Sequence, residues 1–196
     1  MALHLAFEKS ADSMLKALVK ILAGPYVHVE MLVTQTHFHH LDQSPLATLK
    51  HSAYSAFMSE TFACIDQRDF WYSDDSHDFL SVPVSAEELH RIAGACDACV
   101  QSKVPYNTAD MVFSQVPLRN PTERDLYQSK SLFCSQAMVL VLRSCLEPGH
   151  KLQGPLALVN SRTITPSHLY EILKPHCSQK TKAQAVDCAY DPRVHV

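Results

Sequence analysis

Hydrophobic and polar positions follow two different periods along the chain, and these periods predict its elements. Short apolar or β-branched runs predict strands at 3–7, 26–34, 61–65 and 79–84. Apolar residues that recur every three or four positions predict amphipathic helices at 11–22 and 85–103. Gly24 and Pro25 are expected to end the first helix, and Ser85 with Glu88 has the spacing of a capping box that begins the second.

The second half of the chain contains one strongly apolar segment. Six apolar residues at 137–142 follow Cys134, Ser135 and Gln136, which predicts a buried helix with polar residues at its N-terminus. Residues 154–160 have the composition of a strand or an extended segment, and Thr165 before Pro166 predicts another helix at 165–173. Strands and helices are interspersed without a regular βαβ period, so the predicted fold class is α+β.

The length and the charge pattern favour one intracellular domain. We expect a folded domain at 1–175 and a polar C-terminal tail at 176–196. The formal net charge of −3 argues against a nucleic-acid partner. No apolar run approaches the roughly 18 to 20 residues that span a bilayer, and charged residues interrupt the first 23 positions, unlike a signal peptide. These features predict a cytoplasmic protein without a transmembrane segment.

The cysteines are expected to be reduced, and one of them stands out. Their number, seven, is odd and their spacing is scattered, which does not suit a disulfide framework. Cys134 precedes the apolar helix, where the positive end of the helix dipole favours a thiolate. It is therefore a candidate nucleophile, although a free cysteine is more often a small core residue.

His28 is the histidine whose context most resembles a site. It lies in the predicted strand YVHVEMLV, where side chains alternate between the two faces. His28 and Glu30 therefore share one face of an otherwise apolar strand, and two ionisable groups there suggest a site, with His28 as a candidate base for a thiol nucleophile. The plain alternative is a buried structural histidine.

Other polar clusters are weaker candidates for chemistry. Three histidines in the sequence HFHH offer metal ligands, but no cysteine or carboxylate lies at tight ligand spacing. A solvated turn is therefore favoured, and we expect neither a metal nor a cofactor. A Cys-x-x-Cys pair falls inside a predicted helix and suits packing, and the aspartates around the single tryptophan suit a hydrated loop more than a pair of catalytic carboxylates. The positions concerned are His37, His39, His40, Cys96, Cys99, Asp69, Asp74, Asp75 and Asp78.

Several short motifs together resemble a known superfamily. PYVHVEMLV near the N-terminus, VPYNTAD in the middle, LFCSQAMVLVL and then TPSHLYEIL occur in the order typical of circularly permuted papain-like enzymes of the NlpC superfamily. Its motifs most resemble those of members from large DNA viruses and phages. They depart from the family pattern in having Gln136 in place of an acidic residue and no glycine beside Tyr106 and Asn107. The resemblance covers about residues 3–173. It implies an antiparallel sheet packed against helices, with the histidine strand before the cysteine helix.

The resemblance also implies roles for individual residues. Cys134 would be the nucleophile, His28 the general base and later the general acid, and Glu30 the group that orients His28, with Asn107, His39 and Gln35 as alternatives. A backbone N–H of Cys134 or Ser135 would help to form an oxyanion hole. The substrate cleft would be lined by Tyr106, Asn107, Ser135 and Gln136.

The function expected from this resemblance is that of a cysteine hydrolase or acyltransferase. It would act on an amide or ester bond of a peptide or a lipid through an acyl-thioenzyme. The alternative is a catalytically silent structural or interaction protein on the same scaffold, for example a component of a viral particle. A virion or host-protein partner, and a location in the host cytoplasm or the virion, follow if the source is viral. A metal-dependent hydrolase built on HFHH is a third possibility.

Overall fold

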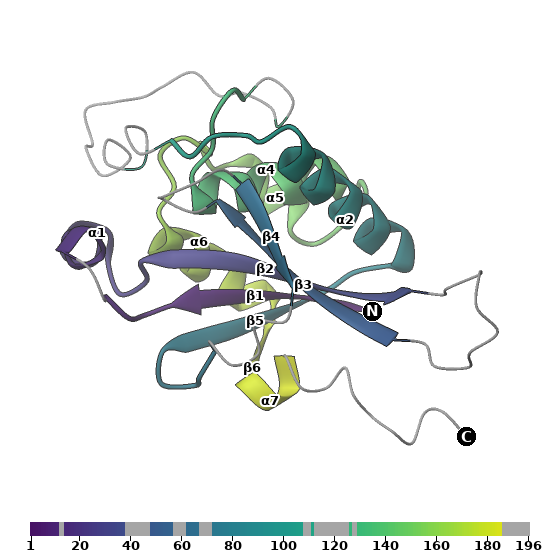
Figure 1. The fold of residues 1–196 in the computed structure, drawn as a ribbon, viewed down its shortest axis with the longest axis horizontal. Helices are drawn as coiled ribbons and strands as arrows, with labels where there is room; N and C mark the ends of the chain where they lie inside the picture. The colour runs from purple at the N-terminus through teal and green to yellow at the C-terminus, as the bar shows by residue number, and fades with distance from the viewer. Residues whose placement is uncertain are drawn as a thin grey trace.

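The structure, a computed structural model, describes residues 1–11, 14–37, 48–56, 62–66, 72–107, 111, 126 and 129–185. Its centre is a six-stranded sheet with the strand order β4-β3-β2-β1-β5-β6, in which every neighbouring pair is antiparallel (Figure 1). The strands are β1 (Ala2–Glu8), β2 (His28–His37), β3 (Thr48–Ala56), β4 (Phe62–Asp66), β5 (His77–Pro83) and β6 (Ser178–Lys180).

Helices cover one face of this sheet, and a short C-terminal helix lies on the other side (Figure 1). The covering helices include α2 and the buried α4, which pack against each other and against β2, β3 or β4. The helical segments are α1 (Met14–Ala23), α2 (Ala86–Gln101), α4 (Cys134–Cys145), α5 (Gln153–Ala157), α6 (Pro166–Leu173), the 3-10 turn η2 (Lys174–His176) and α7 (Lys182–Ala185).

The main core lies between the sheet and the helices. Alternate residues of β1 and β2, such as Leu5 and Met31, are fully buried against α2 and α4, as period-two strands require. In α4 every residue from Cys134 to Leu142 is buried. Each fully buried side chain of this size stabilises the fold by about 1.5–3 kcal/mol, so this core holds the start of α4 firmly in place.

The opposite face of the sheet carries a smaller cluster and several polar groups. Ala6, Tyr72, Phe79 and Ala185 form the apolar part of this cluster. Glu30 belongs to the same face because it pairs with Ala6 across the β1–β2 ladder. The buried Glu30 carboxylate therefore lies on this side of the sheet, where it contacts the Tyr72 hydroxyl.

Several sequence predictions are confirmed. The class is α+β, with an antiparallel sheet and helices. Ser85 and Glu88 form the expected capping box of α2, and Thr165 caps α6 by accepting a hydrogen bond from the His168 N–H. Gly24 follows α1 with a φ of +99°, a conformation that suits glycine.

Other predictions differ from the structure. Residues 153–157 form a helix, α5, where we expected a strand or extended segment at 154–160, because a short apolar run does not distinguish the two. The Arg143 guanidinium stabilises this region by donating to the carbonyls of Leu156 and Val159. Beyond the boundary expected at residue 175, β6 pairs with β5 and α7 packs beside it, so the folded chain continues to at least Ala185. The strand β3 was not predicted.

Candidate active site

Cys134 is the first residue of α4, as the sequence predicts, and its side chain is only 2% exposed. The N-cap residue Phe133 is extended, and its carbonyl accepts the first helical hydrogen bond from Ala137 at 2.9 Å. The first N–H groups of a helix have no partner within it and form its positive end. The Cys134 thiol therefore lies where a thiolate or an oxyanion is stabilised.

His28, the first residue of β2, forms a hydrogen bond with the Cys134 side chain. Burial lowers the pKa of His28, but the negative charge and hydrogen bond of Cys134, followed by those of Glu30, outweigh burial and raise the pKa to about 10. The imidazole is therefore expected to be protonated at neutral pH. The sequence separates the two residues by more than 100 positions, and the fold brings them into contact.

Glu30 lies on the same strand face as His28 and contacts the Nε2 side of its ring. Its Oε1 is 3.5 Å from His28 Nε2, and both side chains are about nine-tenths buried. The Tyr72 hydroxyl donates a hydrogen bond to the other carboxylate oxygen, Oε2. Glu30 is thus held between an aromatic hydroxyl and the imidazole, the arrangement expected of a group that orients His28.

Ser55 of β3 is the second contact of His28 Nε2. Its Oγ lies 3.1 Å from Nε2 and donates a hydrogen bond to the Val29 carbonyl at 2.8 Å. The sheet register explains this position, because Tyr54 pairs with Met31 and the next residue along β3 therefore comes opposite Glu30. Ser55 is fully buried.

Tyr106 approaches Cys134 from a separate segment. Its position beside the start of α4 is set by two backbone hydrogen bonds, from Asn107 N to the Leu132 carbonyl at 2.9 Å and from Leu132 N to the Pro105 carbonyl at 3.0 Å. Burial raises the pKa of Tyr106, and so do the charge of Cys134 and a hydrogen bond with it. The Tyr106 hydroxyl also lies 3.1 Å from the Met111 sulfur. The phenol is therefore a neutral hydrogen-bonding group beside the thiol.

The remaining residues of the predicted cleft are mostly buried. Ser135 is fully buried and its hydroxyl donates to the Ile164 carbonyl at 2.7 Å, so its side chain fixes the start of α4 and does not line a cleft. Gln136 is 2% exposed, and its Oε1 has no hydrogen-bond partner in the described part of the chain. Asn107 is half-buried and fixes the turn through its backbone. His39 lies outside the described residues, and only the backbone of Gln35 is described.

Two of the contacting residues, Ser55 and Tyr72, were missed by sequence reasoning. The segment that contains Tyr72 was interpreted as a hydrated loop because of its aspartates. Ser55 belongs to β3, whose few apolar residues give a weak strand signal. The signal available in the sequence was the pair Ala53 and Tyr54 beside Ser55.

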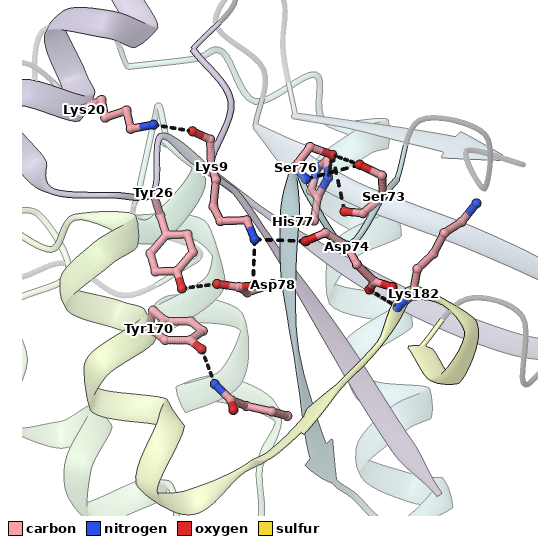
Figure 2. A network of polar contacts seen from close by, with 11 residues as sticks. Lys9, Lys20, Tyr26, Ser73, Asp74, Ser76, His77, Asp78, Tyr170 and Lys182 are labelled. Carbon is pink, nitrogen blue, oxygen red and sulfur yellow. Dashed lines mark hydrogen bonds and ion pairs between the residues drawn. The ribbon is translucent and has the colours of Figure 1, made fainter.

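A neighbouring polar network holds the chain just before His28 (Figure 2). The Tyr26 hydroxyl donates to Asp78, and the Lys9 ammonium donates to Asp78 Oδ1 at 2.9 Å and to the Asp74 carbonyl at 3.0 Å. Asp74 also accepts a hydrogen bond from the Lys182 N–H at 2.6 Å, which attaches α7. These two aspartates therefore serve structural contacts, and Asp69 lies outside the described residues.

The described residues contain no group of three His, Cys, Asp or Glu side chains that could hold a metal ion. His39 and His40 lie outside that part of the chain, and His37 is described by its backbone alone. Cys96 and Cys99 are thiols buried in α2 and form no disulfide among the described residues, and the Cys96 thiol contacts the Met31 thioether at 3.8 Å, as expected for helix packing.

Two further features bear on how the molecule meets other molecules. A surface groove of about 840 Å³ lies between α5 and α6, and Cys134 and His28 are not among its lining residues. Among the helices that the structure describes, none is long and apolar enough to cross a bilayer.

Comparisons with known proteins support the fold alone. No family model matches the chain, and no curated protein matches it in sequence. A solved structure with a similar fold is the crystal structure of metalloprotein yiiX from Escherichia coli O157:H7, DUF1105, with a TM-score of 0.55 and 14% sequence identity. The match covers 91% of this chain and 94% of that chain. The α+β arrangement of this chain is therefore shared, over nearly its whole length, with a bacterial protein of very different sequence.

Proposed function

We propose that the protein is a cysteine hydrolase or acyltransferase with a circularly permuted papain-like fold, in which Cys134 is the nucleophile and His28 the general base. The observation that carries the proposal is the hydrogen bond between a histidine at the start of a strand and a cysteine at the positive end of a helix. The motif order of the sequence supports the relation to permuted papain-like enzymes. The substrate would be an amide or ester of a peptide or a lipid.

The reaction follows from the positions of the groups. The Sγ of Cys134 attacks the carbonyl carbon and forms a C–S bond, while the carbonyl electron pair moves to the oxygen. Backbone N–H groups at the start of α4 form the positive end of the helix, where this oxyanion is stabilised, and the Tyr106 hydroxyl is a further hydrogen-bonding group beside the sulfur. His28 then gives its proton to the leaving nitrogen or oxygen as the C–N or C–O bond breaks.

The second half of the reaction regenerates the thiolate. Neutral His28 takes a proton from water, or from the hydroxyl or amine of an acceptor, as that oxygen or nitrogen attacks the acyl carbon. The C–S bond breaks and the sulfur leaves as a thiolate beside the newly formed imidazolium. Water gives hydrolysis, and another acceptor gives acyl transfer.

A catalytically silent structural or interaction protein is the second candidate. It is favoured by one observation, the burial of Cys134, whose side chain is only 2% exposed. A scaffold requires neither an accessible thiol nor a proton acceptor beside it.

The deciding experiment is the alkylation of Cys134 by iodoacetamide from pH 5 to 10, followed by mass spectrometry of the peptides. The wild type is compared with His28→Ala. Cys177 provides an internal reference, since it is half-buried and burial raises its pKa to about 11. Because only the thiolate reacts, we expect Cys134 of the wild type to react at pH 6 while Cys177 does not.

The His28→Ala variant separates the two candidate functions. For the enzyme, loss of the imidazolium lowers the Cys134 alkylation rate at pH 6 by about tenfold or more, as expected when about 1.4 kcal/mol or more of thiolate stabilisation is removed. A Cys134 that is inert at every pH in both proteins, or that follows Cys177 in both, contradicts the enzyme and supports the scaffold.

A further inference from the structure

The Ser55 hydroxyl has only one hydrogen, and the structure shows where it goes. Ser55 Oγ is 2.8 Å from the Val29 carbonyl, an oxygen that can only accept. The Ser55 hydrogen is therefore directed to that carbonyl. Oγ then has only lone pairs to offer to His28 Nε2, which lies 3.1 Å away from it.

This geometry determines which nitrogen of His28 carries a hydrogen. An oxygen that only accepts is paired favourably with an N–H, so Nε2 must be protonated. The Glu30 carboxylate, at 3.5 Å, is a second acceptor for the same N–H. With Nε2 occupied in this way, Nδ1 is the ring nitrogen that remains for the Cys134 thiol.

We propose that Ser55 is a positioning residue that fixes the Nε2–H tautomer of His28 and thereby presents Nδ1 to Cys134. The inference rests on the proposed function for its purpose, although the tautomer itself exists with or without catalysis. When His28 is an imidazolium, Nε2–H stays with Ser55 while Nδ1–H faces the thiolate. When His28 is neutral, the same contact keeps the lone pair on Nδ1, where a proton from water or another acceptor must arrive.

Ser55 and Glu30 both contact His28 Nε2, but they act on it differently. Glu30 supplies negative charge, which favours the imidazolium, at the longer distance. Ser55 supplies no charge but makes the shorter contact, and its own hydrogen is committed to the backbone of β2. A carboxamide at position 30 can donate as well as accept and no longer specifies the tautomer, whereas the Ser55 contact still does.

The other charged groups around His28 do not compete for Nε2–H in the same way. Glu8 pairs with His28 across the β1–β2 ladder, and its carboxylate is engaged by Lys16 at 2.9 Å and Ser10 at 2.7 Å. His77 lies opposite Glu8 on the next strand, and its Nδ1 contacts Ser76 Oγ at 2.8 Å. Cys134 and Tyr106 face the site from the side of α4.

The test is nitrogen NMR of the His28 ring in ¹⁵N-histidine-labelled protein that carries Cys134→Ala. This background removes the thiolate, so that His28 becomes neutral at accessible pH, and it removes the nucleophile. His28 signals are assigned by their loss in His28→Gln. Three further variants are compared above the pKa that each one shows, namely Glu30→Gln, Glu30→Gln with Ser55→Ala, and Glu30→Gln with Ser55→Thr.

We expect only the Nε2–H tautomer in Glu30→Gln, because Ser55 is intact. The addition of Ser55→Ala should make the Nδ1–H tautomer appear beside it, and Ser55→Thr, which restores a hydroxyl, should suppress that form. A mixture already present in Glu30→Gln, or the same tautomer with Ser55→Ala as without it, overturns the inference. Backbone amide spectra of each variant show that the fold is intact, a property that a tautomer change does not alter.

Failure of this inference and failure of the proposed function give different results. The tautomer is read in a protein that has no Cys134 thiol, whereas the proposed function is tested by alkylation of that thiol. An Nε2–H tautomer that depends on Ser55, together with an unreactive Cys134, would leave the Ser55 contact established and remove the enzyme.

Discussion

Replacing Cys134 with alanine is expected to lower the pKa of His28 by at least about 2 pH units. In the intact protein burial lowers this pKa, whereas the charge and the hydrogen bond of Cys134, and then the contacts of Glu30, raise it from 6.5 to about 10. Because burial opposes them, these favourable contributions together exceed the net rise. The two from Cys134 are larger than the two from Glu30, so removal of the thiolate takes away at least half.

The corresponding free energy can be stated. Half of the rise from 6.5 to about 10 is close to 2 pH units, and at about 1.36 kcal/mol per unit this is about 2–3 kcal/mol of imidazolium stabilisation. In the Cys134→Ala variant, burial still disfavours the charged His28 ring and Glu30 still favours it. His28 of the variant is therefore expected to be neutral over much of the range in which the wild type is protonated.

The measurement is an NMR pH titration of the His28 ring, assigned with His28→Gln. In the wild type the transition near pH 10 is expected to be the loss of the His28 imidazolium proton. Cys99→Ala is the matched control, since Cys99 is also a buried thiol but contributes nothing to the His28 pKa. A His28 that titrates near 6.5 in the intact protein, or that stays near 10 without the Cys134 thiol, refutes the reasoning.

Three other changes test the structure around the site. Glu88→Gln should lower the free energy of unfolding by about 1–3 kcal/mol at pH 7, because burial raises the pKa of Glu88 but hydrogen bonds from backbone N–H groups outweigh burial and lower it. A carboxylate whose pKa is lowered in the folded state stabilises the fold above its unfolded pKa, near 4.5. In urea unfolding at several pH values, the difference from wild type should therefore shrink as the pH falls below 4.5. Tyr106→Phe removes the hydroxyl that forms a hydrogen bond with Cys134. It should slow alkylation of the Cys134 thiol at pH 6 by about threefold to tenfold, as expected for a hydrogen bond of about 1 kcal/mol. Gly24→Ala should reduce the free energy of unfolding by about 1–3 kcal/mol, because φ is +99° and a Cβ would lie 2.9 Å from Ser167 Oγ of α6.

Each of these changes has a control and a result that contradicts it. Glu87→Gln removes an exposed carboxylate from the same helical turn, so an equal loss of stability in both variants would refute the role of Glu88. For the glycine, Gly94→Ala lies in α2 with open space around the position and should stabilise by about 0.5–1 kcal/mol; destabilisation by both alanines would refute the argument. Unchanged alkylation in Tyr106→Phe would exclude the phenol as a donor to the sulfur.

The local signals of the sequence determined where several elements begin and which residues share a strand face. Ser85 and Glu88 began α2, Thr165 began α6, and a cysteine before an apolar run marked the start of α4. Strand alternation alone placed His28 and Glu30 on one face. These predictions succeeded because capping and alternation depend on residues within a few positions of one another.

Only the tertiary structure decided which distant groups meet. Strand pairing and helix packing bring Cys134 and Ser55 to His28, and Tyr106 to Cys134. The local hydrophobic pattern does not specify which strands pair or in which register. The same reason explains why β3 and β6 were missed, since polar strands at or near a sheet edge are defined by their partners more than by their own hydrophobicity. The sequence thus determined the chemical candidates, while the sheet register determined that Ser55 and Glu30 stand behind the imidazole and that the thiol stands in front of it.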